Sequence, residues 1–357
     1  MSTSSLLTSR RGSEDLRELE SLLQDLTELL VATPGPDDVE RQLGNVFERI
    51  RLSLRYVRSD NDMEIICQEV LESHTFEESR EEVLQILSRT DDKDPSNAYI
   101  IYSLLYRLGQ DYPNTYRRLL EEDWHHHLKD VILERVGDRS HHVAVQLLYE
   151  LAKMQELSIG DLETFDTPFL TFLLDRIEKT RDVGEAENYA LIRLLLVLHE
   201  QFRLKTQFSA SFPNRVTSTI SSRINESKTL SENFVFMFNR GGDTSFQLVM
   251  IRFLKEVFES EILATLFYTN DTRVILDVIL RETRNTAEED EAVREGYILL
   301  LPSLLRNTDL GKYGYKSAEV IRMLTELRDS PLGRSGTRRV ADRVLNEVQG
   351  VLGEVWC

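Results

Sequence analysis

The densest group of possible metal ligands in the sequence is the run His125, His126 and His127, followed by His141 and His142. Imidazole is a common zinc ligand, so metal binding is the first chemistry to consider. Consecutive residues of a helix point about 100° apart, however, and no cysteine or paired carboxylate beside the run completes a tetrahedral set. The spacing therefore predicts no metal site among these histidines.

Other catalytic patterns are incomplete. His199-Glu200 begins like a zinc-protease motif, but Arg203 occupies the position where the second histidine must follow. Gly241-Gly242 and Gly311-Lys312 lack the spacing of a phosphate-binding loop, and no predicted strand precedes either pair. The sequence has no Gly-x-Ser-x-Gly elbow and no Cys-His arrangement that would supply a nucleophile. We therefore expect a protein without catalytic residues or cofactor, not an enzyme.

Composition and net charge limit the kinds of partner that the protein is expected to bind. The chain has 357 residues, a formal net charge of -18, 41% hydrophobic residues and 29% charged residues. This balance is ordinary for a folded globular protein, and the excess negative charge predicts no nucleic-acid partner because it repels phosphate backbones. Two cysteines, Cys67 and Cys357, are too few for a disulfide framework and suit the reducing cytoplasm.

Membrane and targeting signals are weak. The longest strongly apolar run, Ala190 to Leu198, contains Arg193 and is far shorter than the roughly 20 residues that span a bilayer. We therefore expect no membrane insertion. Met1 to Ser13 is rich in Ser, Thr and Arg and lacks an apolar segment, which indicates a short disordered leader over residues 1–13.

Apolar residues recur every three or four positions along most of the chain, which is the spacing of one face of a helix. The pattern starts after the hydroxyl and two acids of Ser13-Glu14-Asp15, resumes after a break at Thr33 to Pro36, and has later starts at Thr167-Pro168 and Asp243. Phe234 to Phe238 could pass for a strand but lacks alternation, so we expect a helix there as well.

The expected helices include Leu16–Leu30, Val39–Val57, Met63–Leu71, Glu78–Leu87, Asn97–Leu108, Trp124–Val136, His142–Met154, Phe169–Ile177, Tyr189–Phe202, Val274–Leu280, Ala292–Leu305 and Val340–Val355. Roughly eighteen helices joined by short turns, with no strand, are typical of an all-α protein. Helix pairs or triplets recur at about 40 residues, the period of armadillo and HEAT units. This favours an armadillo/HEAT-like α-solenoid of stacked helices over a bundle, with residues 14–357 forming a single armadillo-like helical domain.

Four segments carry a resemblance to a known family. They are Leu198-His-Glu-Gln-Phe202, Phe238-Asn-Arg-Gly-Gly-Asp243, Leu266 to Arg281 (LFYTNDTRVILDVILR) and Tyr297 to Thr308 (YILLLPSLLRNT). In this order they resemble the leucine-rich, armadillo-like domain of the WISH/DIP/SPIN family. The chain lacks the Src-homology domain and proline-rich stretches of the animal members, so it is similar to the fungal Dip type.

The resemblance implies a function. It implies that the protein binds and activates the actin-related protein 2/3 complex, and that it nucleates linear actin filaments without a preformed filament by stabilising the active short-pitch conformation. Actin would be reached indirectly, through the nucleated filament, and the protein would act in the cytoplasm at cortical actin patches of the cytoskeleton, in endocytosis. The alternative is a generic armadillo-like adaptor without nucleation activity, although the sequence shows no regular asparagine ladder for a peptide groove.

The candidate partner contacts are polar residues of the matching segments. They are Arg273, Asp277, Arg281, Arg306, Asn239 and Arg240. The first three lie off the apolar stripe expected for their helix, which consists of Val274, Ile275, Val278 and Ile279. Asn239 and Arg240 have an alternative role, in which they organise a turn with Asp243, and Asp243 caps the next helix.

Overall fold

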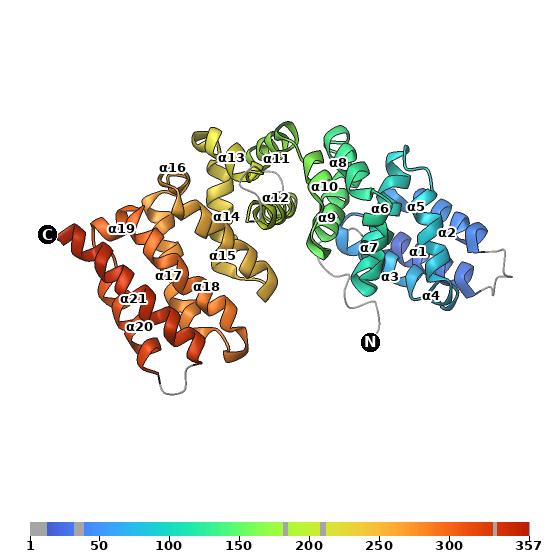
Figure 1. The fold of residues 1–357 in the computed structure, drawn as a ribbon. Helices are drawn as coiled ribbons and strands as arrows, with labels where there is room; N and C mark the ends of the chain where they lie inside the picture. The colour runs from blue at the N-terminus through green and yellow to red at the C-terminus, as the bar shows by residue number, and fades with distance from the viewer. Residues whose placement is uncertain (1–12, 32–38, 181–184, 208–211, 331–333, 357) are drawn as a thin grey trace. The chain divides into compact units, whose positions relative to one another are not determined.

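The computed structural model describes residues 13–31, 39–180, 185–207, 212–330 and 334–356. Within these ranges every regular element is a helix, which confirms the predicted all-α class with solenoid-like stacking (Figure 1). The predicted leader falls outside the described residues, except for Ser13, which begins the first helix. None of the described helices is long and apolar enough to cross a bilayer.

The chain divides into two compact units, Met1–Gln155 (unit 1) and Glu156–Cys357 (unit 2). The helices of unit 1 are α1 (Ser13–Val31), α2 (Val39–Ser53), α3 (Asp60–Leu71), α4 (His74–Glu78), α5 (Arg80–Arg89), α6 (Pro95–Asp111), α7 (Asn114–Glu121), α8 (Trp124–Glu134) and α9 (Arg139–Met154). α1 packs against α2 and α3, and α6 contacts α2, α3 and α9. The predicted single domain over residues 14–357 stays a prediction.

Unit 2 is built from recurring groups of two long helices and one short helix. Its helices are α10 (Ile159–Thr164), α11 (Thr167–Lys179), α12 (Glu185–Thr206), α13 (Arg215–Ser222), α14 (Lys228–Arg240), α15 (Thr244–Glu259), α16 (Glu261–Ala264), α17 (Thr269–Asn285), α18 (Glu291–Arg306), α19 (Asp309–Lys312), α20 (Ser317–Asp329) and α21 (Ser335–Trp356). The long helices α15, α18 and α21 start about 45 residues apart, which is a HEAT-like period.

The long helices of unit 2 form two layers. In one layer α12 packs against α15, α15 against α18, and α18 against α21; in the other, α14 lies between α11 and α17. The short helices α13, α16 and α19 make the connections between successive groups. Each layer buries an apolar side against the other, so that α12, predicted to be apolar nearly all round, is buried along most of its length.

Helix starts follow local capping chemistry. Asp243 accepts a hydrogen bond from the Phe246 backbone N–H at 2.9 Å, which confirms the predicted cap of α15. The start of α11 is capped one residue earlier than predicted, because Asp166 accepts from the Phe169 N–H at 3.0 Å. For α17 the sequence predicts Thr269 or Asn270 as the cap, and this is wrong: the N-cap is Tyr268, whose backbone N–H donates to the Asp271 carboxylate at 3.0 Å.

The core of unit 2 contains an aromatic cluster that joins α14, α15, α18 and the connection between α16 and α17. Phe234 lies with its ring centroid 5.2 Å from that of Phe253 and 5.7 Å from that of Phe267, and Phe238 lies 5.8 Å from Tyr297. All five side chains are buried. Because Phe234 and Phe238 are four residues apart on α14, they stand on the same side of the helix, which confirms helix rather than strand for Phe234 to Phe238.

We expect Phe234→Ala to destabilise unit 2 by about 3–5 kcal/mol, because it removes a fully buried ring and leaves a cavity between α14, α15 and the start of α17. Phe236→Ala is the matched control, since Phe236 is 46% exposed on the same helix. Urea unfolding followed by circular dichroism measures both. Equal losses for the two variants would contradict the helical register of α14.

Candidate partner-binding surface

α17 presents one polar side to the solvent. Arg273, Asp277 and Arg281 follow one another at intervals of four residues, which aligns them along the helix, and the opposite side is buried through Ile275, Leu276, Val278, Ile279 and Leu280. Val274 was expected in the buried stripe but is 39% exposed. It lies on the polar side because its direction from the helix axis is close to that of Arg281.

Arg281 links α17 to the end of α14. Its guanidinium donates to the side-chain oxygen of Asn239 and to the backbone carbonyl of Asn239, both at 3.0 Å. The second bond satisfies a carbonyl at the C-terminal end of α14, where backbone acceptors lack helical partners and a cation is favoured by the helix dipole. Two of the predicted contact residues are therefore in direct contact with each other.

Arg240 lies beside an exposed aromatic pair. Its guanidinium carbon lies 5.1 Å from the ring centroid of Phe236, and a guanidinium nitrogen lies 3.5 Å from Glu185. Phe236 in turn stacks on Tyr189 of α12, with ring centroids 6.1 Å apart and an angle of 22° between the planes. Sequence reasoning missed Phe236 and Tyr189. The available signal was that Phe236 precedes Arg240 by one helical turn and lies off the buried side of α14.

Arg273 and Asp277 contact the segment before α20. Arg273 lies over the ring of Tyr315 at 5.2 Å, and Asp277 pairs with the Lys316 ammonium at 2.8 Å and accepts a bond from the Tyr315 hydroxyl at 3.3 Å. The hydrogen bond to Asp277 raises the pKa of Lys316 above its usual value. Tyr315 and Lys316 are further residues of this surface that the sequence did not indicate.

Arg306 lies apart from the other five predicted residues. It lines an open surface pocket of about 490 Å³ at the N-terminal end of α17, together with Tyr268, Thr269 and Asp309. Arg281, by contrast, is near the C-terminal end of the same helix. The structure thus gathers Asn239, Arg240, Arg273, Asp277 and Arg281 and leaves Arg306 at a second location.

We name the gathered residues the α14–α17 surface, consisting of Tyr189, Phe236, Asn239, Arg240, Arg273, Val274, Asp277, Arg281, Tyr315 and Lys316. It combines four cations with three aromatic rings on a chain whose net charge is -18. Arginine and aromatic side chains are the residues that most often dominate binding energy at protein interfaces. The arrangement is suited to hold an acidic or mixed protein surface.

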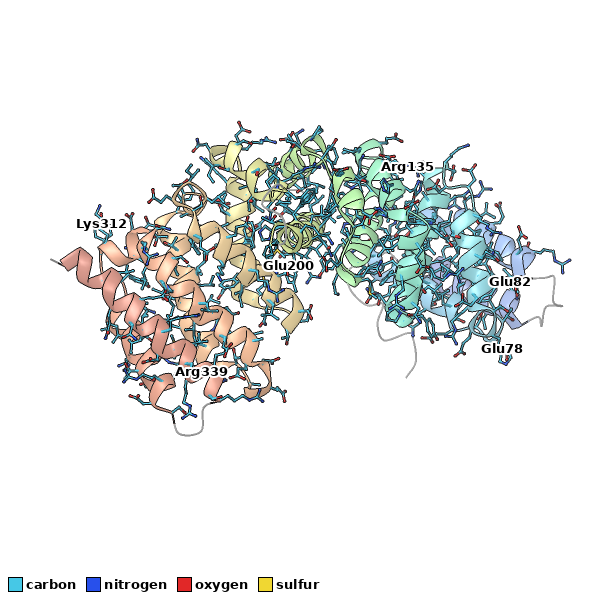
Figure 2. All side chains as sticks on the ribbon, in the orientation of Figure 1. Glu78, Glu82, Arg135, Glu200, Lys312 and Arg339 are labelled. Carbon is cyan, nitrogen blue, oxygen red and sulfur yellow. The ribbon has the colours of Figure 1, made fainter. Side chains whose placement is uncertain are left out.

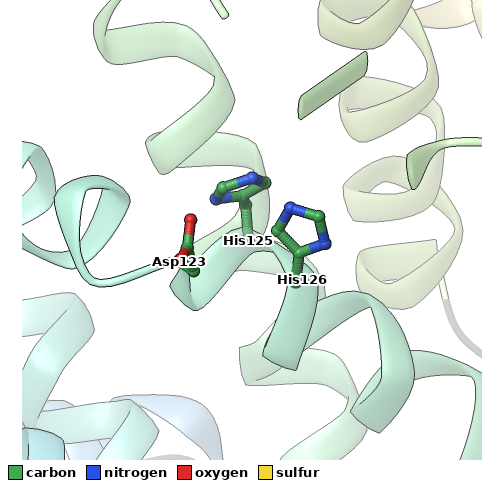
Figure 3. A group of neighbouring side chains, drawn as sticks. All are labelled: Asp123, His125 and His126. Atoms are coloured by element: carbon green, nitrogen blue, oxygen red, sulfur yellow. The ribbon is translucent and has the colours of Figure 1, made fainter. Parts of the chain in front are cut away.

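The histidine run separates in the structure. The Nε2–H of His127 donates to the Asp92 carboxylate at 2.6 Å, and Asp92 also accepts a bond from Tyr102. His125 and His126, in contrast, lie beside Asp123 (Figure 3). The possible ligand atoms of these three residues lie within 4.8 Å of one another. A structural zinc site uses four ligands about 2.0–2.3 Å from the ion, so this group is neither complete nor tight. The expected absence of a metal site stays a prediction.

The Leu198-His-Glu-Gln-Phe202 motif builds a polar network inside unit 2. His199, fully buried on α12, lies 2.8 Å from the carboxylate of Glu256 on α15. Glu256 also accepts from the Thr217 hydroxyl of α13 at 2.8 Å and from the Asn214 amide at 3.3 Å. Burial works to raise the pKa of Glu256, but the bonds from these three residues together lower it below its usual value.

The next residue of the motif extends this network. Glu200, labelled in Figure 2, accepts two bonds from Arg203 at 2.7 and 2.8 Å and one from Arg252 of α15 at 2.6 Å. Arg203, which breaks the zinc-protease pattern, is thus the ion-pair partner of Glu200. The motif has a structural role in unit 2, since His199 and Glu200 join α12 to α15.

The fold defines the class, a helical-repeat protein, and the α14–α17 surface is a cationic and aromatic candidate for contact with a partner. Comparison with known families is more specific, because residues 184–320 match the family model described as the SPIN90/Ldb17 leucine-rich domain. This match confirms the resemblance that the sequence motifs indicated. The matched range contains all six predicted contact residues.

Three curated fungal relatives are similar to this chain. Protein LDB17 of Eremothecium gossypii is 27% identical over 231 residues, covering 64% of this chain and 49% of that protein. Protein LDB17 of Saccharomyces cerevisiae is 27% identical over 188 residues (52% and 38%), and Protein dip1 of Schizosaccharomyces pombe is 30% identical over 181 residues (50% and 48%). The alignments thus span about half or less of each relative.

Glu256 should make the stability of unit 2 dependent on pH. Its pKa is lowered in the folded protein. Its contribution to the free energy of unfolding is therefore fully present above its usual pKa near 4.5 and is lost as pH falls through the lower folded value. We expect Glu256→Gln to be about 1–3 kcal/mol less stable than wild type at pH 7, because bonds to a charged acceptor are replaced by weaker ones.

The difference in free energy of unfolding between wild type and Glu256→Gln should decrease between pH 5 and pH 3. Urea unfolding at each pH measures it. Glu259→Gln, an exposed position on the same helix, is the control and should change little. A gap between wild type and Glu256→Gln that stays constant over this range would contradict the assigned role of the carboxylate.

Proposed function

We propose that the protein binds the actin-related protein 2/3 complex and activates it to nucleate linear actin filaments without a preformed filament. The observation that carries this proposal is the match of residues 184–320 to the SPIN90/Ldb17 leucine-rich domain. It agrees with the activity that the resemblance to the WISH/DIP/SPIN family implies. The protein would act without catalytic groups or cofactor, in the cytoplasm at cortical actin patches.

The proposed mechanism is a shift of population. A protein that binds the short-pitch arrangement of the two actin-related subunits more tightly than the resting arrangement moves the equilibrium toward the short-pitch one. Each factor of ten in this preference is worth about 1.4 kcal/mol, and a shift from 1% to 99% active needs a factor of about 10⁴. Such a preference requires a surface that keeps one shape while the partner changes.

The α14–α17 surface is the contact we propose for this partner. It lies within the matched residues, and its cations have partners: Arg281 bonds Asn239, Arg273 lies over Tyr315, and Lys316 pairs with Asp277. Side chains that are already ordered lose less conformational entropy on binding. A surface with four cations can also steer an acidic patch of the partner into place.

The direct test mixes the pure protein with the complex and pyrene-labelled actin monomers, with no filament seeds and no other activator. The proposal predicts a shortened lag and, by microscopy, linear filaments that do not branch from older ones. Binding to the complex without faster polymerisation would support the generic adaptor instead. Neither binding nor faster polymerisation would overturn the proposal.

We expect the double variant Arg273→Glu, Arg281→Glu to lower the polymerisation rate about tenfold, because it removes two attractive charges and adds two repulsive ones. Asn239→Ala should lower it only two- to threefold, since it frees Arg281 without removing the charge. The double variant Arg338→Glu, Arg339→Glu, at two exposed positions of α21, is the charge-matched control and should leave the rate unchanged; Arg339 is labelled in Figure 2.

The outcome for Asn239 decides between two roles of Arg281. If Asn239→Ala and Arg281→Glu alone reduce the rate equally, Arg281 acts by joining α17 to α14 and does not contact the partner. Thermal unfolding of each variant checks that the loss is not a loss of folded protein.

A further inference from the structure

Unit 1 contains a cavity that the proposed activity does not use. It lies among α3, α6 and α9 and has a volume of about 280 Å³. Its floor is formed by Met63, Cys67, Tyr99 and Val143, all of which are buried. Sites for whole small molecules are typically about 300–1,000 Å³, so this cavity has room for one long side chain and little more.

The rim of the cavity is polar and mainly acidic. Asp60 and Glu64 of α3 are 68% and 61% exposed, and one turn apart on the same side of the helix. Arg107 of α6 is the cation at this rim, but it already pairs with Glu64 at 3.3 Å and with Asp111 at 3.0 Å. His142 of α9 does not line the cavity, but its Nε2 lies 3.5 Å from Asp60. Of the charged side chains that line the cavity, two are carboxylates, Asp60 and Glu64, and one is a cation, Arg107.

The remaining groups at the rim are uncharged hydrogen-bonding side chains. They are Ser103 and Gln110 of α6 and Gln146 of α9. A glutamine side chain has both a donor and an acceptor, so it can bond the N–H and the C=O of a peptide backbone. These residues lie along neighbouring helices, since α6 packs against both α3 and α9. A chain segment crossing the helices would therefore meet amide groups of α6 and of α9.

An apolar floor below an acidic rim matches one kind of side chain. Lysine and arginine carry an aliphatic stem that is stable against apolar surface and a charged head that remains at the polar edge. A carboxylate would be repelled by Asp60 and Glu64, and a purely aliphatic side chain would leave both carboxylates without a new partner.

From these observations we infer that the α3–α6–α9 cavity is a peptide-binding site that receives one lysine or arginine side chain of an extended segment from a partner protein. The stem lies against Met63, Cys67, Tyr99 and Val143, and the charged head pairs with Asp60 and Glu64. Gln110 and Gln146 bond the backbone of the segment. This site belongs to unit 1 and is independent of the α14–α17 surface.

The test uses the full chain and a display library of random twelve-residue peptides. Selection is run in parallel on wild type, on Asp60→Asn, Glu64→Gln and on Glu82→Gln, an exposed carboxylate of α5 that does not line the cavity and is labelled in Figure 2. We expect wild type and Glu82→Gln to enrich peptides with lysine or arginine at one fixed position. The double variant should lose this enrichment.

A selected peptide then gives the affinity by fluorescence anisotropy. We expect Asp60→Asn, Glu64→Gln to weaken binding at least tenfold, replacement of the fixed basic residue by alanine to have a similar effect, and higher salt to weaken the wild-type complex. Gln146→Lys should also weaken binding at least fivefold, because its own ammonium can occupy the acidic rim.

Failure to enrich a basic position on wild type would overturn the inference, as would equal enrichment on the double variant. Thermal unfolding separates these outcomes from misfolding, and neither exposed substitution removes buried apolar surface. The actin polymerisation assay gives an independent readout, because the cavity variants should retain full activity there if the two sites are separate.

Discussion

Apolar packing between successive long helices is the interaction on which the rest of unit 2 depends. α15 packs against α12 and α18, and its Phe253 contacts Phe234 of α14, so that no one group of helices covers all of its buried residues. The approach of α18 to α15 is close: a Cβ added at Gly296 would lie 3.0 Å from Cγ2 of Ile251. Because each helix is positioned by its neighbours, the exposed side chains of α14 and α17 are held at a fixed distance from one another.

Apolar packing is not directional, so polar contacts are needed to fix how the helices align along their lengths. The network of His199, Glu256, Thr217 and Asn214 does this for α12, α13 and α15, since each of its bonds is made only in one register. Removing one member would leave others buried without their partner, which costs more than the bond itself contributes. The Leu198 to Phe202 motif, which resembles an incomplete zinc-protease motif, therefore serves to align α12 with α13 and α15.

The sequence predicted the long helices well and the surface only in part. A three- to four-residue repeat needs several turns to be visible, so α12 and α15 were evident, whereas α4, α16 and α19, of four or five residues, were not. Arg273, Asp277 and Arg281 could be placed on one side of α17 from their spacing alone. Their partners Tyr315 and Asn239 could not, because contacts between residues about 40 positions apart depend on the packing of whole helices.

The fixed positions of these side chains bear on how the α14–α17 surface could act on a partner. Each immobilised long side chain costs about 0.5–1.5 kcal/mol on binding if it is mobile beforehand, and Arg281 and Lys316 have already lost part of that freedom. A mobile surface would adapt to both arrangements of a two-state partner and shift neither, because only a difference in affinity moves the equilibrium. Rigid helices with arginines held by neighbouring side chains favour whichever arrangement fits them, so the packing of unit 2 is itself part of the proposed mechanism.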